Sequence, residues 1–211
     1  MTLRLDGYGT RSGRAVFLDR DGTLIEEVGY LDRKERVELY PWTIDAIRAL
    51  NRASFHVVLI TNQSGVARGF FTEAVVEDVH QHLAALLESG GARVDAYYYC
   101  PHHPDGKVEQ YAVRCDCRKP ARGLVDRAVR ELGVDPARSF VVGDRWLDIE
   151  LARAVGARGV LVRTGYGLTE EARPREPRAA DAIVDNLIAA ASWILRNVAI
   201  ADRQSPIGDR T

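Results

Sequence analysis

Short apolar segments alternate along the chain with segments whose apolar residues recur every three or four positions. The second kind predicts helices, as at residues 43–53, where Ile44, Ile47 and Leu50 fall on one helical face, and at residues 186–198. The alternation predicts βαβ units, and therefore an α/β fold in which helices cover both faces of a parallel sheet. The strands are predicted at residues 15–19, 56–62, 94–100, 139–144, 158–165 and 181–185.

Local signals also place several helix ends and one loop. A long helix is predicted at residues 72–89 with Thr72 as its N-cap, and two later helices are predicted to end at Gly133 and Gly156. Residues 168–181 are polar and contain prolines, which predicts a loop.

A single domain accounts for most of the chain. The 211 residues are 46% hydrophobic, which is enough for a sizeable core. Neither a linker nor an internal repeat marks off a second domain. We predict an N-terminal extension at residues 1–14, one domain at residues 15–199 and a flexible tail at residues 200–211.

Charge and hydropathy limit the classes of partner. The 29 Lys and Arg residues nearly balance the 30 Asp and Glu residues, so no net field favours nucleic acid or a membrane surface. The N-terminal residues lack an apolar leader pattern, and no apolar run reaches about 18 residues. We therefore expect a soluble, cytoplasmic protein with neither a nucleic-acid nor a membrane partner.

Polar residues follow three of the predicted strands. Asp19 and Asp21 follow the first strand, Thr61 and Asn62 end the second, and Asp144 ends the fourth. Ligands of an open parallel sheet lie beyond the carboxyl ends of its strands, so we expect these side chains to converge. Taken singly, each has an alternative explanation as a turn residue or a helix cap.

The two aspartates at the first strand suggest phosphate chemistry. In an extended segment, residues two apart project to the same side, so Asp19 and Asp21 can face one ligand. Two carboxylates this close stay ionised at neutral pH beside a cation, and oxygen ligands suit Mg²⁺, which also accepts phosphate oxygens. Asp144 would complete the charge cluster. A carboxylate held beside phosphorus can act as a nucleophile, and its neighbour can move the proton.

Four motifs in register carry a family resemblance. They are DRDGT, LITNQSG, CRKP and VVGDRWLD, in this order. Over roughly residues 15–167 they resemble the haloacid dehalogenase (HAD) superfamily of phosphohydrolases, which implies a Rossmann-like sheet. The segments in which this superfamily usually inserts cap domains are too short here to fold independently, so we expect a capless monomer with a relatively open site.

The resemblance implies a role for each matching residue. Asp19 is the expected nucleophile, and Asp21 is the expected general acid and base, whose main-chain carbonyl also binds Mg²⁺. Thr61 would hydrogen-bond the transferring phosphoryl group, and Lys119 would neutralise its charge. Asp144 would be a Mg²⁺ ligand.

A further carboxylate follows one helical turn after the last of these residues. This residue, Asp148, is similar to the second acidic residue of the last motif, which implies that it orients Lys119 or a metal-bound water. The alternative is that Asp148 is a solvent-facing carboxylate on a helix.

All three cysteines of the chain lie in one loop. Cys100, Cys115 and Cys117, with His102, supply three sulfurs and one imidazole, which is a ligand set of tetrahedral structural Zn²⁺ sites. His103 is the competing histidine, and reduced thiols without metal are the alternative to a zinc site. A closed four-ligand site has no open coordination position, so zinc would fold the loop and position the two basic residues that follow it.

This zinc loop, residues 100–117, also points to a subgroup. Together with the segment EEVGY and residues 63–72, it resembles the heptose-bisphosphate phosphatases, and less closely the histidinol-phosphate phosphatases. The first resemblance implies removal of the 7-phosphate from D-glycero-D-manno-heptose 1,7-bisphosphate, a small phosphorylated sugar, on the route to nucleotide-activated heptose. The substrate contacts that it implies are Glu27, Val28, Gly29, Tyr30, Thr61, Asn62, Gln63, Ser64, Arg118, Lys119 and Arg145.

Three alternatives remain open. Ile25 stands where many heptose-bisphosphate phosphatases have Asn, and DRDGTLI also occurs in histidinol-phosphate phosphatases, although the twelve-residue spacer between His102 and Cys115 favours the heptose substrate. The planar fork of Arg118 suits a second phosphate or sugar hydroxyls, but Arg118 can also be a surface cation. The alternative to an enzyme is a zinc-stabilised module that binds phosphorylated ligands without turnover.

Overall fold

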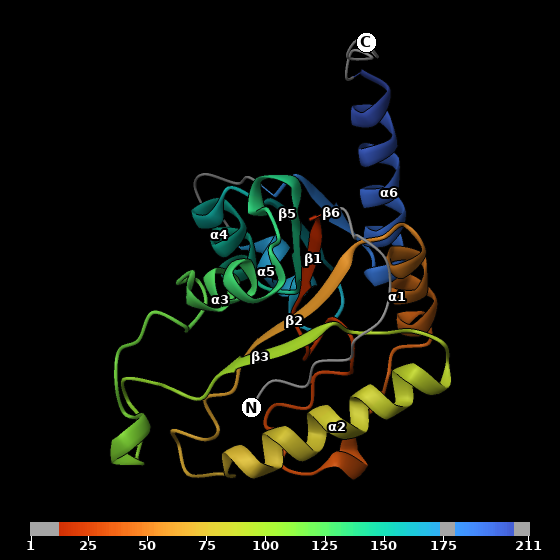
Figure 1. Cartoon of the computed structure of the whole chain (residues 1–211). Coiled ribbons are helices and arrows are strands. Elements are labelled where there is room, and N and C mark those ends of the chain that lie inside the picture. The colour runs from red at the N-terminus through yellow and green to blue at the C-terminus, as the bar shows by residue number, and fades with distance from the viewer. Residues whose placement is uncertain (1–12, 174–179, 205–211) are drawn as a thin grey trace.

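The computed structural model of the chain describes residues 13–173 and 180–204. Most of the predicted N-terminal extension (1–14) and most of the predicted tail (200–211) therefore lie outside the described residues. Between these ends the chain forms one sheet with helices packed around it (Figure 1).

The described residues form a six-stranded sheet. Its strands are β1 (Ala15–Leu18), β2 (His56–Asn62), β3 (Ala96–Cys100), β4 (Phe140–Gly143), β5 (Arg158–Val162) and β6 (Ala182–Val184). They pair in parallel in the order β3-β2-β1-β4-β5-β6, so the chain builds one half of the sheet and then returns past β1 to build the other. The predicted α/β fold is confirmed.

Six α-helices of the described residues surround this sheet. They are α1 (Thr43–Arg52), α2 (Glu73–Ser89), α3 (Gly123–Leu132), α4 (Trp146–Val155), α5 (Gly167–Ala172) and α6 (Leu187–Gln204). Val16 and Leu18 of β1 belong to a core shared with α1, α2 and α6, whereas Phe17 belongs to a core shared with α3 and α4. Successive strand side chains point to opposite faces, so one apolar run supplies both cores. Figure 1 shows α1 and α6 on one side of the sheet and α3 and α4 on the other.

The helix ends agree only in part with the predicted caps. α3 and α4 end at Gly133 and Gly156, whose left-handed conformations (φ 66° and 77°) suit glycine. Thr72 occupies the N-cap position of α2, but its side chain makes no capping hydrogen bond, so the predicted capping role is wrong. α6 continues to Gln204, past the boundary predicted at residue 199.

A short helix, α5, replaces the beginning of the loop that was predicted at residues 168–181. Its anchor is Trp146, the first residue of α4. The indole Nε1 of Trp146 donates to the carbonyl oxygen of Glu170 (2.7 Å), and the Trp146 backbone N–H donates to the Glu170 carboxylate (3.1 Å). These bonds join residues 24 positions apart, and therefore leave no local pattern in the sequence.

No separate cap domain covers the sheet within the described residues. The segment between β1 and α1 contains only one short 3₁₀ helix, η1 (Lys34–Arg36), and the segment between β3 and α3 contains only η2 (Glu109–Tyr111). The expected capless architecture agrees with this arrangement, and loops alone border the carboxyl ends of the strands.

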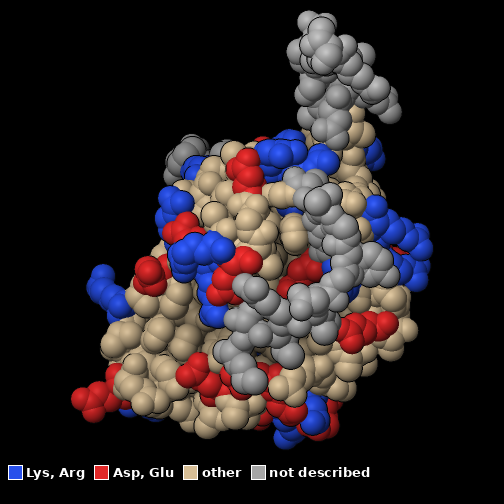
Figure 2. Space-filling model, in the orientation of Figure 1, with Lys and Arg blue, Asp and Glu red and all other residues tan. Residues whose placement is uncertain are grey.

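The surface carries charges of both signs. Figure 2 shows Lys and Arg side chains interspersed with Asp and Glu on the face presented there, in line with the formal net charge of −1. Among the helices that the structure describes, none combines the length and the apolar character needed to span a membrane.

Candidate active site

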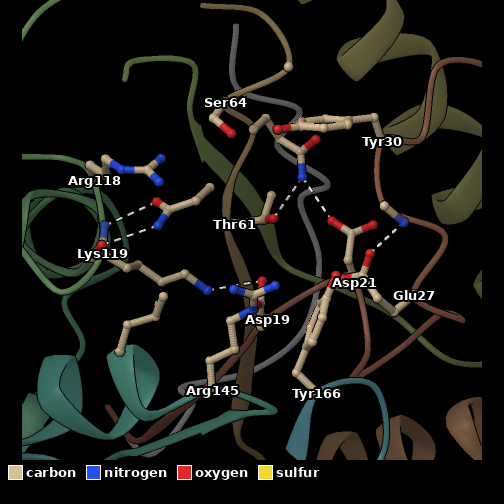
Figure 3. Close-up of a pocket in the computed structure, with 15 residues that line it drawn as sticks. Asp19, Asp21, Glu27, Tyr30, Thr61, Ser64, Arg118, Lys119, Arg145 and Tyr166 are labelled. Carbon is tan, nitrogen blue, oxygen red and sulfur yellow. Dashed lines mark hydrogen bonds and ion pairs between the residues drawn. The ribbon is translucent and has the colours of Figure 1, made fainter. Parts of the chain in front are cut away.

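A cavity of about 260 Å³ lies where the carboxyl ends of β1 and β2 meet the loops after β3 and β4. Figure 3 shows its polar side chains pointing toward one another. The expected convergence of polar strand ends is therefore observed. The lining includes these predicted residues: Asp19, Asp21, Glu27, Gly29, Tyr30, Thr61, Asn62, Gln63, Ser64, Arg118, Lys119 and Arg145.

Asp19 lies on the floor of this cavity, immediately after β1. Its backbone N–H donates to Val142 O (3.0 Å), which extends the pairing between β1 and β4 by one residue. Its Oδ1 accepts hydrogen bonds from Lys119 Nζ (2.9 Å) and from the Arg20 backbone N–H (2.7 Å). The carboxylate is only 8% exposed as a residue, so these contacts hold it in one orientation at the sheet edge.

Lys119 is buried and links three elements of the fold. Besides Asp19, its Nζ contacts Asp148 Oδ1 (2.7 Å) and donates to Ile60 O (3.0 Å). Burial acts to lower the pKa of Lys119, but the charges of Asp148 and Asp19 outweigh burial and raise it. Burial raises the pKa of Asp148 to about 6, against the opposing effect of Lys119. Asp148 is 0% exposed, so the alternative of a solvent-facing carboxylate is wrong, and it lies where it orients Lys119.

Replacing Asp148 by asparagine is expected to lower the free energy of unfolding by about 2–4 kcal/mol, because it breaks a buried ion pair. Asp19 would remain as the partner of Lys119, which keeps the loss toward the lower end of this range. Urea denaturation without added Mg²⁺ measures the effect. Asp45→Asn, which removes an exposed carboxylate paired with Arg48, is the matched control and should change stability by less than about 1 kcal/mol. Equal losses in both variants would contradict the buried role of Asp148.

Asp21 is held by a side chain that was not predicted. Arg20 is only 1% exposed, and its guanidinium donates to both carboxylate oxygens of Asp21, with Nη2 to Oδ2 at 2.9 Å. On its other side, Arg20 Nη1 lies 3.4 Å from Nε2 of the buried His80. Burial, with the Arg20 charge, lowers the pKa of His80 well below its usual value, so His80 stays neutral and accepts this hydrogen bond. A charged residue between two aspartates was the only sequence signal for this network.

One amide joins two of the strand ends. Gln63 Nε2 donates to Asp21 Oδ2 (2.9 Å) and to Thr61 Oγ1 (2.9 Å), and dashed lines in Figure 3 mark these two bonds at the labelled Asp21 and Thr61. Gln63 thereby fixes the hydroxyl of Thr61 relative to the Asp21 carboxylate. The Thr61 hydroxyl, a neutral group that can donate and accept hydrogen bonds, is thereby held near the Asp21 carboxylate.

The carboxylates at the cavity floor fit a hard divalent cation. Oxygens of Asp19, Asp144 and Asp148 lie within 4.8 Å of one another. Asp144 Oδ2 accepts from the Tyr166 backbone N–H (2.8 Å), whereas its buried Oδ1 has no hydrogen-bond partner among the described residues. Burial, followed by the charge of Asp19, raises the pKa of Asp144 to about 8. A cation bound to these oxygens would favour the ionised carboxylates, and Mg²⁺ prefers such oxygen ligands.

The predicted zinc ligands form a second cluster, on the loop between β3 and α3. Cys115 Sγ lies 3.5 Å from Cys100 Sγ and 3.3 Å from Cys117 Sγ, and His102 Nδ1 lies 3.4 Å from Cys117 Sγ. The ligands of a tetrahedral site with Zn–S bonds of ~2.3 Å are separated by ~3.8 Å, so the cluster fits Zn²⁺. A hydrogen bond from Cys100 lowers the pKa of Cys117 to about 5, which favours the thiolate that a metal requires.

The competing histidine lies outside this cluster. His103 Nδ1 accepts from the Asp105 backbone N–H (3.1 Å), and His103 Nε2 lies 3.2 Å from Arg68 Nη2. The four groups that can share one metal ion are instead the three cysteines and His102. Spacing alone left this choice open, and the fold of the loop brings His102 rather than His103 close to the three sulfurs.

Hydrogen bonds between side chains and the main chain connect the zinc loop to the cavity. The side chain of Asn62 at the end of β2 accepts from Lys119 N–H (3.0 Å) and donates to Lys119 O (3.2 Å). Arg118 Nη1 donates to His102 O (3.3 Å). Asn62 therefore positions the main chain that carries Lys119.

The rim of the cavity differs from the prediction at one residue. Glu27 Oε1 accepts from Gly29 N–H (2.6 Å), and burial raises the pKa of Glu27 despite this hydrogen bond. Tyr30 packs edge-on against Phe70, with ring centroids 4.6 Å apart. Val28, which was predicted to contact substrate, does not line the cavity, because its apolar side chain packs against the core.

The cavity also contains residues that the sequence did not single out. They are Gly65, Leu147 and Tyr166. Tyr166 lies directly before α5, between the strand predicted at residues 158–165 and the loop predicted at residues 168–181, and its ring stacks on Arg145. No motif or periodicity marks such a residue, since its place in the site depends on the return of the chain after β5.

Two protein families match this chain. Residues 14–149, more than half of the chain, match the family described as polynucleotide kinase 3 phosphatase, and residues 116–190 match the HAD-hydrolase-like family. Together the two matches include the cavity floor and both groups of residues that could hold a metal ion.

Individual relatives match over nearly the whole length. A Yersinia pestis protein named D-glycero-beta-D-manno-heptose-1,7-bisphosphate 7-phosphatase is 40% identical over 192 residues, covering 90% of this chain and 94% of its own. A protein of the same name from Escherichia coli K12 is 43% identical over 179 residues, covering 84% and 91%.

Solved structures agree with these matches. The B. bronchiseptica D,D-heptose 1,7-bisphosphate phosphatase, complexed with magnesium and phosphate, has a TM-score of 0.78 and 33% identity, covering 87% of this chain and 99% of its own. A putative HAD-like phosphatase from Mesorhizobium loti has a TM-score of 0.77 and 31% identity, covering 92% and 93%. The sequence, the fold and the cavity thus lead to one conclusion: the chain belongs to the HAD-like phosphatases.

Proposed function

We propose that this phosphatase removes the 7-phosphate from D-glycero-β-D-manno-heptose 1,7-bisphosphate. The observation that carries the proposal is the contact of Asp19 with buried Lys119 in the cavity that also contains Asp21 and Thr61. The substrate is the one named for relatives that are 40–43% identical over most of the chain. We further propose that the protein acts as a cytoplasmic monomer on this small sugar, in the synthesis of nucleotide-activated heptose.

In the proposed first step, an oxygen of Asp19 attacks the phosphorus of the 7-phosphate. The bond between phosphorus and the sugar oxygen breaks, and Asp21 donates a proton to that oxygen. The product is an aspartyl phosphate on Asp19 and a heptose 1-phosphate. In the second step Asp21 takes a proton from water, whose oxygen attacks phosphorus and releases inorganic phosphate from Asp19.

Two further side chains stabilise the transferring group in this scheme. Lys119 places a fixed positive charge beside Asp19, and the Thr61 hydroxyl donates to a phosphoryl oxygen. Mg²⁺ would be held by Asp19, Asp144 and the main-chain carbonyl of Asp21, and when bound it supplies neutralisation of the phosphate and carboxylate charges. Mg²⁺ is the cation in the B. bronchiseptica complex.

The zinc loop is proposed to have a structural role. Zn²⁺ bound by Cys100, His102, Cys115 and Cys117 would leave no open coordination position, so it would not contact substrate. It would instead fix the main chain immediately before Arg118 and Lys119, which both line the cavity.

The position of Ile25 weakens the main argument for histidinol phosphate as the substrate. Ile25 is 1% exposed and belongs to the core that contains Leu24 and Leu31. Its side chain does not line the cavity, so its departure from the heptose pattern alters packing rather than a direct substrate contact. We therefore retain the heptose bisphosphate as the proposed substrate.

The purified protein with Mg²⁺ is expected to release one inorganic phosphate from each β-heptose 1,7-bisphosphate, with kcat/KM about 10²-fold or more above that for histidinol phosphate, since the second phosphate adds charge-assisted contacts. Phosphate release measured on one preparation with the α anomer, the β anomer and histidinol phosphate provides the comparison. Gel filtration into Mg²⁺-free buffer, which leaves tightly bound Zn²⁺ in place, should stop turnover, and added Mg²⁺ should restore it. Faster turnover of histidinol phosphate would overturn the substrate assignment, and binding without turnover would favour a non-catalytic module.

A further inference from the structure

An arginine and a tyrosine form a stacked pair at the rim of the cavity. The Arg145 guanidinium carbon lies 3.8 Å from the centroid of the Tyr166 ring, and both residues line the cavity. Figure 3 shows them at the same side of the cavity. Stacking of a guanidinium on an aromatic face is an attractive cation–π arrangement.

The stack leaves the hydrogen-bonding edge of Arg145 free. Within residues 13–173 and 180–200, its guanidinium makes no hydrogen bond or ion pair, and its one ring contact is the stack on Tyr166. The backbone N–H of Arg145 is separately bonded to Asp148 Oδ2 (3.2 Å). A guanidinium held by its face presents its N–H donors in one plane, which suits bidentate contact with a phosphate.

The Tyr166 ring is itself held on a rigid turn. The Tyr166 backbone N–H donates to Asp144 Oδ2 (2.8 Å), and Thr164 Oγ1 donates to Gly22 O (2.6 Å). Gly165, between them, has φ +56° and packs so closely against Gly22 and Asp144 that a Cβ atom would clash with both. The turn after β5 is thereby fastened to the loop after β1, and the backbone that carries the Tyr166 ring has a defined place.

The pair belongs to the rim rather than the floor of the cavity. Lys119 on the floor is 3% exposed, whereas the Tyr166 residue is 38% exposed. Glu27 belongs to the loop on the rim, and although burial raises its pKa, the charge of Arg145 opposes this rise. Arg145 therefore acts where the outer part of a bisphosphate would lie, while Lys119 serves the phosphate at Asp19.

We propose that Tyr166 is a positioning residue for substrate selectivity: its ring holds the Arg145 guanidinium in place to bind the phosphate that is not transferred. This inference rests on the proposed bisphosphate substrate. A free arginine side chain loses rotamer entropy when it binds a ligand, and a stacked one has already lost much of it. Loss of the ring should therefore weaken binding of the bisphosphate without altering the chemical step at Asp19.

Tyr166→Leu is expected to raise KM for β-heptose 1,7-bisphosphate about five- to tenfold, with kcat changed less than about twofold. This size of change is expected because the variant loses one cation–π contact, which affects only substrate binding. For heptose 7-phosphate, which lacks the second phosphate, kcat/KM should stay unchanged. Tyr166→Phe retains the ring and should behave as the wild type. In the Arg145→Ala background, Tyr166→Leu should add no further increase in KM.

The outcomes separate this inference from the proposed function. A wild type that shows no preference for the bisphosphate over heptose 7-phosphate would refute the proposed substrate and the role of Tyr166 with it. A wild type that prefers the bisphosphate, combined with an unchanged KM in Tyr166→Leu, would overturn the role of Tyr166 alone. Equal losses on both substrates in Tyr166→Leu would also overturn it, because they indicate a general structural defect.

Discussion

Replacing Asp19 by asparagine is expected to abolish steady-state phosphatase activity, with kcat lowered by roughly 10⁴–10⁶-fold. The carboxamide has nearly the shape of the carboxylate but lacks the anionic oxygen that attacks phosphorus in the proposed first step. The contact with Lys119 Nζ at 2.9 Å would lose its ionic character, but Asp148 still pairs with Lys119. The variant should therefore fold and still bind phosphate compounds.

Phosphate release from β-heptose 1,7-bisphosphate measures this loss, and circular dichroism confirms that the variant is folded. Asp126→Asn on α3 is the matched control, because it removes an exposed carboxylate that pairs with Arg122 away from the cavity. This control should keep wild-type kcat. Turnover of Asp19→Asn within about tenfold of the wild type would refute Asp19 as the nucleophile.

Loss of zinc is expected to produce the second large effect. Cys117→Ser should reduce the zinc content from about one ion per chain to none and lower kcat/KM by about 10²-fold or more, since displacement of a catalytic group by about 1 Å has an effect of this size. The group concerned is Lys119, which follows Cys117 by two residues. A stability loss of about 3 kcal/mol would lower Tm by roughly 6–12 °C for a chain of this length.

The adjacent histidines provide a matched pair of controls for the zinc site. His102→Gln should lose zinc as Cys117→Ser does, whereas His103→Gln should retain both zinc and activity, because His103 bonds to Asp105 and Arg68 instead. Metal analysis, thermal unfolding and phosphate release would be measured on all three variants. A metal-free wild type with full activity, or a Cys117→Ser variant that keeps one zinc, would contradict the proposed site.

The zinc loop also has contacts that do not involve the metal. Glu73 at the start of α2 accepts hydrogen bonds from Tyr99 of β3 (2.6 Å) and from Tyr111 of the zinc loop (2.5 Å). Asn62 separately fixes the backbone of Lys119. These contacts join segments far apart in sequence, so loss of zinc is expected to loosen the loop without unfolding the whole domain.

Much of the fold was predictable, because the signals that define it are local. Short apolar segments placed the six strands of the described sheet, and glycine identified the ends of α3 and α4. The start of α5 was not predicted, because it depends on hydrogen bonds between Trp146 and Glu170. A polar segment such as this one acquires its structure from a distant partner rather than from its own pattern.

The site was predictable to a similar extent and for the same reason. Asp19, Asp21 and Thr61 lie at strand ends, and a parallel sheet brings such ends to one edge. Arg20 and Tyr166 were missed, because a buried guanidinium and a stacked ring are recognised only by what surrounds them. Val28 was predicted to contact substrate because it lies between Glu27 and Tyr30 in the sequence, but its side chain packs against the hydrophobic core.

Residue type and spacing along short stretches were enough to predict the α/β class, the acidic residues at the strand ends and the grouping of the three cysteines. The folded chain was needed to show that His102 rather than His103 lies beside the sulfurs. It was also needed to show that Asp148 is buried beside Lys119 and that Arg145 stacks on Tyr166. The physical reason is that burial, ion pairing and stacking are set by contacts between segments that are distant in sequence, and these contacts exist only after the chain has folded.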